Sequence, residues 1–131
     1  METRGLFTPA DAAAARERYA ALATAAGTVT REVARALDAD PDEAVVETAH
    51  EALFASLLEV RLSDRAAYES WLSDHPDWTV VEHGSDQVDQ VAWHPAPAAE
   101  TVVAATYDSE PAAAAAALRR QAFGTVYGDL L

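Results

Sequence analysis

The segments Trp78–His83 (WTVVEH) and Val91–His94 (VAWH), separated by the turn Gly84–Asp86 (GSD), decide the predicted fold. The first segment alternates weakly between apolar and polar residues, which is the period of a β-strand, and the second follows it after the turn. Pairing Thr79 with His94 gives an antiparallel hairpin with one coherent apolar face and a polar face that carries His83 and His94. The apolar face consists of Trp78, Val80, Val91 and Trp93.

The residues after the hairpin predict one more strand and a closing helix. Thr101–Tyr107 could form a strand or a short helix, and its Thr, Val and Tyr content favours a strand. Asp108–Pro111 then opens a helix that continues through six alanines to about Tyr127. The apolar row of this helix is Leu118, Ala122, Val126 and Leu130.

The residues before the hairpin predict helices. Thr8–Asp11 (TPAD) predicts an N-cap with proline in the first turn, and Gly27 predicts the end of that first helix. A second helix is expected to begin near Thr28. One side of it would carry Val29, Val33, Ala36 and Leu37.

A third and a fourth helix complete this half of the chain. Asp40–Glu43 (DPDE) predicts the start of a helix that runs to about Leu62, with glutamates on one stripe and apolar residues around the rest. Ser63 or Asp64 is expected to cap the fourth helix, which ends at His75–Pro76.

These elements predict a single α+β domain over residues 1–131. Its helical part, about 8–75, would be an N-terminal bundle of about four helices. Its second part, about 77–131, would be a small antiparallel sheet closed by the C-terminal helix. The sheet would contain the hairpin and, if 101–107 is extended, a third strand.

The charge balance indicates a salt-rich environment. The chain has 22 acidic and 9 basic residues, a net charge of −13, and every basic residue is arginine. In dilute buffer this charge would repel itself, whereas at about 1 M salt the Debye length is only ~3 Å. The absence of cysteine excludes disulfides and thiolate metal sites. Met1–Pro9 lacks an apolar run and no uncharged stretch reaches ~18 residues, so we expect a cytoplasmic protein without a membrane segment.

Two small groups of residues are candidates for a binding surface. Arg119 and Arg120 form the one adjacent basic pair in this acidic chain, and they precede Phe123. They could contact an anion or a partner, or they could simply favour the C-terminal end of their helix. Trp93 and His94 are the second group. No cofactor and no metal are predicted.

Three other patterns are weaker. Glu47–His50 has the Glu-x-x-His spacing of di-iron bundles, but it occurs once, so we expect His50 to pair with Glu47 or Glu51. In the predicted hairpin, His83 and His94 lie roughly 13 Å apart at ~3.3 Å per residue, too far to share a metal. The segment from Thr30 resembles a helix-turn-helix, but its second helix is acidic, which disfavours nucleic-acid binding.

Four stretches of the chain are similar to a small uncharacterised family of haloarchaeal proteins, a domain of unknown function. They are Ala15–Tyr19, Val46–Phe54, Val91–His94 and Leu118–Gly124. The resemblance implies a halophilic archaeal source and a cytoplasmic location, and it implies no activity.

We therefore expect a non-enzymatic protein that acts through protein–protein contacts, as a homodimer or with an unknown protein partner. The alternative is a ligand-binding protein or enzyme with a pocket between the sheet and the long helix, using His50 or His94 with a carboxylate. A second alternative is a nucleic-acid-associated regulator. It would need Arg31, Arg35, Arg119 and Arg120 on one face.

Overall fold

The computed structural model describes residues 1–38 and 42–131, which form an α+β fold around a five-stranded mixed sheet. The strands are β1 (Glu2–Arg4), β2 (Val60–Asp64), β3 (Thr79–His83), β4 (Gln90–Ala96) and β5 (Thr101–Thr106). Their order across the sheet is β1-β2-β4-β5-β3, and all neighbours are antiparallel except β3 and β5. The predicted α+β class is confirmed, and so is the strand predicted over 101–107.

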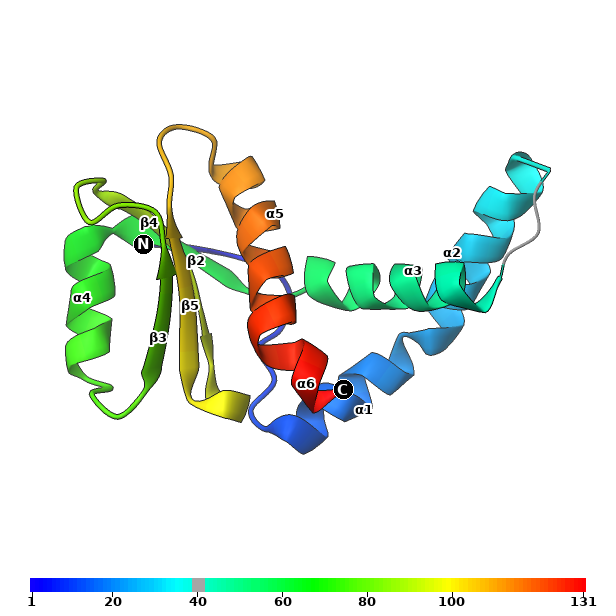
Figure 1. The fold of residues 1–131 in the computed structure, drawn as a ribbon, viewed down its shortest axis with the longest axis horizontal. Helices are drawn as coiled ribbons and strands as arrows, with labels where there is room; N and C mark the ends of the chain where they lie inside the picture. The colour runs from blue at the N-terminus through cyan, green and yellow to red at the C-terminus, as the bar shows by residue number, and fades with distance from the viewer. Residues whose placement is uncertain (39–41) are drawn as a thin grey trace.

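Helices lie on both faces of this sheet (Figure 1). The helices are α1 (Ala12–Ala21), α2 (Ala23–Ala36), α3 (Glu43–Ser56), α4 (Arg65–Ser73), α5 (Pro111–Ala122), a π-helical turn (Phe123–Tyr127) and α6 (Gly128–Leu130). Helix α4 covers one face and α5 the other, while α2 and α3 project away from the sheet beyond α5. No helix among the described residues is long and apolar enough to cross a membrane.

The predicted hairpin is wrong, because β5 lies between β3 and β4. Thr79 pairs with Thr101, and His94 pairs with Val103. The chain reverses after β4 through a short 3-10 turn that ends at Glu100 in the left-handed conformation (φ 45°). This turn joins β4 to β5 as the true hairpin, and β3 is added to β5 in parallel. Parallel strands are joined by a long connection and not by a tight turn, so the sequence contains no local signal that β3 pairs with β5.

The predicted four-helix bundle is also wrong. Helix α3 ends at Ser56 instead of continuing to about Leu62, and Val60–Asp64 forms strand β2 between β1 and β4. Val60 and Leu62 are buried as strand residues in the larger core. Helix α4, which follows β2 directly, lies on the opposite face of the sheet from α3 and does not pack beside it (Figure 1).

Acidic side chains cap α1, α3 and α4, in part where the sequence predicted. Helix α1 is capped by Asp11 rather than Thr8, and Gly27 lies inside α2 instead of ending a helix. Asp64 caps α4 as predicted, with its carboxylate accepting a hydrogen bond from a backbone N–H at 2.8 Å. Asp42 caps α3 in the same way. The predicted start signal at Asp40–Pro41 lies outside the described residues.

The core is divided by the sheet into two clusters. The larger lies between the sheet and the helices α3 and α5 and includes Phe54, Leu118 and Tyr127. The smaller lies between the sheet and α4 and includes Tyr68 and Trp93. The apolar row predicted for the C-terminal helix faces the larger cluster across α5, the π-helical turn and α6, with Leu118, Ala122 and Val126 buried and Leu130 half-buried.

Candidate functional site

The sequence-predicted binding residues fall into two places. Trp93 and His94 are neighbours on β4, and neither has any exposed surface. Trp93 belongs to the smaller core, where its indole N–H donates to the Ser63 hydroxyl at 3.0 Å and the Arg61 guanidinium lies 5.0 Å from its ring centre. His94 points to the opposite side, because successive strand residues alternate. These two residues therefore offer no external surface to a partner.

His94 forms a buried hydrogen-bonded pair with Tyr127. Its Nδ1 lies 2.6 Å from the Glu59 carbonyl oxygen, which can only accept, so Nδ1 carries the proton. Nε2 therefore accepts a hydrogen bond from the Tyr127 hydroxyl at 2.7 Å. Burial, with a smaller contribution from Arg61, lowers the pKa of His94 to about 4, and burial raises the pKa of Tyr127. The imidazole is neutral, and both of its nitrogens are occupied.

His94, expected on a polar hairpin face, is thus an interior bridge between β4, the start of β2 and the C-terminal helix. The π-helical turn from Phe123 brings Tyr127 to it. A sequence signal existed, since β4 reads as a nearly continuous apolar run, which is typical of a strand buried on both faces. A histidine in such a strand needs partners for both ring nitrogens.

The remaining histidines do not gather into a site. His50 contacts the Tyr19 carbonyl through Nε2 and stacks on the Tyr19 ring at 3.6 Å between centres, instead of pairing with Glu47 or Glu51. His83 is exposed on the edge strand β3, away from the buried His94. Within residues 1–38 and 42–131, no group of three or more His, Cys, Asp or Glu side chains could hold a metal ion.

Arg119 and Arg120 lie at the corner where α5 meets α3. The Arg119 Nε donates to the Leu58 carbonyl at 2.9 Å, and burial, together with Arg4, lowers the pKa of Arg119. Both arginines line a recess of about 200 Å³. Its other walls are Ala52, Ala55, Ser56 and Ala116. Phe123 packs edge-on against Phe54 in the core below.

This recess adjoins a larger and more open concavity of about 440 Å³ on α3, and the two share Ala52. The lining residues are Asp42, Ala44, Val45, Thr48, Ala49 and Ala52. Three of these six residues are alanines, so this side of α3 is a shallow trough. Val45 itself is 50% exposed.

Helix α2, beside α3, exposes larger apolar side chains. Val29, Val33 and Leu37 are 56%, 54% and 72% exposed. They recur every four residues and therefore form one ridge along the helix. We call α2 and α3 together the arm. Its apolar face is the α2 ridge (Val29, Val33, Ala36 and Leu37) with the α3 trough (Val45, Ala49 and Ala52).

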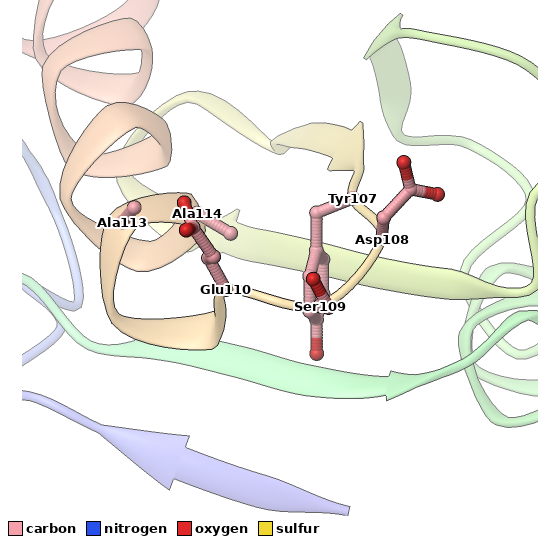
Figure 2. Close-up of a pocket in the computed structure, with 6 residues that line it drawn as sticks. All are labelled: Tyr107, Asp108, Ser109, Glu110, Ala113 and Ala114. Atoms are coloured by element: carbon pink, nitrogen blue, oxygen red, sulfur yellow. The ribbon is translucent and has the colours of Figure 1, made fainter.

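A third hollow, of about 430 Å³, lies on the loop before α5 (Figure 2). Figure 2 shows the carboxylates of Asp108 and Glu110 projecting in different directions, with Tyr107 and Ser109 between them. No basic side chain lines the hollow. Its polar groups do not converge on one point, so it provides no arrangement for binding a small ligand.

A family model described as a family of unknown function (DUF5809) matches residues 6–128. The chain belongs to this family. The match includes the whole arm, β2 to β5 and α5, and it leaves out only β1 and the last residues of the chain. No curated protein and no solved structure matches the chain. Membership of the DUF5809 family therefore assigns no activity to the chain.

Proposed function

We propose that this member of the DUF5809 family is a small, non-enzymatic, halophilic protein of the cytoplasm that acts through protein–protein contacts. The observation that carries the proposal is the apolar face of the arm. Fully burying a Val or Leu side chain stabilises a protein by about 1.5–3 kcal/mol. Three such residues in one row, all at least half exposed, indicate a surface that a partner covers.

The charges of the arm support the same proposal. The charged residues of the two helices are Arg31, Glu32 and Arg35 in α2 and Glu43, Glu47 and Glu51 in α3. None of them belongs to the apolar face. Interface centres are depleted of charged residues in this way. An uncharged strip is conspicuous on a chain with a net charge of −13.

The site geometry gives less support to the two alternatives. An enzyme that used His94 would need to break its hydrogen bond to the Glu59 carbonyl or to the Tyr127 hydroxyl. A nucleic-acid surface would need arginines gathered on one face, but Arg31 and Arg35 belong to the projecting α2 whereas Arg119 and Arg120 belong to α5 (Figure 1).

Affinity capture in about 2–4 M KCl, where exposed charges are screened, tests the proposal. Tagged wild-type protein and tagged Val33→Glu are used as baits in lysate of the source cell, and identified proteins, including untagged copies of the chain, are quantified. We expect the variant to lose most of what the wild type recovers. Val80→Glu is the matched control, because Val80 is 43% exposed on β3, outside the arm. Equal recovery by all three baits would contradict the proposal.

A further inference from the structure

We infer that the apolar face of the arm is covered by a second copy of this chain, which docks arm against arm. This inference rests on the proposed function and names the partner. It is supported by the area of the molecule, the shape of the face and the distribution of charge, each taken from a different observation.

The molecule has more surface than a compact monomer of its mass. Its accessible area is 7389 Å² for 13.9 kDa. Folded monomers of this mass expose about 6,700 Å², which is roughly 700 Å² less. A specific dimer of standard size buries about 800 Å² on each partner. The excess therefore corresponds to one side of an ordinary dimer interface, and the arm is the part that projects from the compact body (Figure 1).

The two apolar strips lie on the same side of the arm. On α2, Ala26 and Thr30 are buried, and at 3.6 residues per turn the ridge lies to one side of them, with Glu32 at its outer edge, whereas Arg31 and Arg35 lie on the other side. On α3, the half-buried His50 faces α1. The trough lies to one side of His50, and the glutamates lie to the other. Figure 1 shows α3 crossing α2 instead of running along it, and the two helices are in contact, so these phases bring the ridge and the trough together only where the helices cross.

The shape of this face is self-complementary. A two-fold dimer uses the same patch on both partners, so the patch must carry both halves of its own fit. Here the α2 ridge is built from Val29, Val33 and Leu37, whereas the α3 trough is built mainly from alanine. In a dimer with a two-fold axis through the contact, the ridge of each copy lies against the trough of the other. A partner without such a ridge would leave the trough unfilled.

Charge adds a condition to this assembly. Each copy brings a net charge of −13, so two copies repel each other in dilute buffer. At about 1 M salt the Debye length is ~3 Å, and repulsion between the two bodies is largely screened. The centre of the contact is apolar, and its charged neighbours lie at the ends of the trough, Asp42 at one end and Arg119 and Arg120 beyond the other, so screening removes little of the attraction. We therefore expect the dimer to form at high KCl and to dissociate as KCl is removed.

Sedimentation equilibrium of the purified full chain in about 3 M KCl tests the inference. We expect the wild type to show twice the mass of 13.9 kDa at micromolar concentration. Val33→Glu places a carboxylate in the contact and should weaken the dimer by roughly 100-fold or more. Val45→Glu, on the other helix of the same face, should do the same, whereas Val80→Glu should remain dimeric. Circular dichroism identifies any variant that does not fold.

Several results would overturn the inference. The inference is wrong if the wild type stays monomeric up to about 100 µM, a concentration far above the Kd of a specific interface of standard size. A dimer that persists in both folded arm variants would also overturn it. A dimer broken only by Val80→Glu would place the contact at the β3 edge. If the wild type is monomeric but Val33-dependent capture of an identified protein persists, the second copy is excluded while the proposed function stands.

Discussion

Replacing Tyr127 with Phe tests the buried pair that joins the C-terminal helix to the sheet. The substitution keeps the ring, which is fully buried against Phe54, and removes only the hydroxyl that donates to the His94 Nε2 at 2.7 Å. His94 cannot turn to find another donor, because its Nδ1 is held by the Glu59 carbonyl. The imidazole nitrogen is then left buried without a partner.

An unsatisfied buried acceptor costs about 1–3 kcal/mol, and we expect the free energy of unfolding to fall by that amount. Urea unfolding followed by tryptophan fluorescence in about 3 M KCl measures it. With an m-value of about 1–3 kcal/mol/M, the midpoint should move down by roughly 1 M urea. The m-value should stay unchanged, since the fold is the same.

Tyr107→Phe is the matched control, because Tyr107 is a half-buried tyrosine beside the open hollow of Figure 2. Its loss of a hydroxyl should change the stability by no more than about 0.5 kcal/mol. If Tyr127→Phe is as stable as Tyr107→Phe, the His94–Tyr127 hydrogen bond contributes nothing.

Three further changes should alter stability in defined ways. The pKa of His94 is about 4 in the folded protein and about 6.5 in the unfolded chain. The contribution of the neutral imidazole to the free energy of unfolding is therefore fully present above pH 6.5 and is lost as the pH falls towards 4. Between pH 7 and pH 4, the free energy of unfolding should therefore fall by about 3 kcal/mol more in the wild type than in His94→Gln, as measured by urea titrations. Arg119→Ala removes the donor to the Leu58 carbonyl and should lower the free energy of unfolding by about 1–2 kcal/mol. Arg120→Ala should leave it nearly unchanged in the same titration. Asp64→Ala removes the cap of α4 and should lower the thermal midpoint by several degrees, equivalent to about 1 kcal/mol.

Local signals in the sequence were sufficient for the elements that they alone determine. Asp64 caps α4, Pro111 begins α5, and the Thr and Val content of 101–107 forms β5, as the residue types predict. The ridge of α2 was also predicted as one side of a helix. Its exposure could not be predicted, because an apolar helix face reads the same whether it packs inside the domain or against a partner.

The errors occurred where distant residues decide the structure. Val60–Asp64 follows the helical pattern of α3 without a glycine or proline, and pairing with β1 and β4 makes it a strand. Inserting β5 between β3 and β4 depends on a parallel pairing with no local turn. The misplaced hairpin then put His94 on a polar face. Its hydrogen bond to Tyr127 spans 33 residues and depends on the same tertiary arrangement.

Cross-linking at a single introduced cysteine tests the arm contact most directly, because the chain has no cysteine of its own. Val33→Cys lies on the ridge of α2, and Val80→Cys is an equally apolar exposed position on β3. In about 3 M KCl, a short thiol-reactive cross-linker should convert most of the Val33→Cys protein to a covalent dimer and leave Val80→Cys monomeric. Removing the KCl before the reaction should abolish the product. Efficient cross-linking at position 80, or none at position 33, would contradict the account.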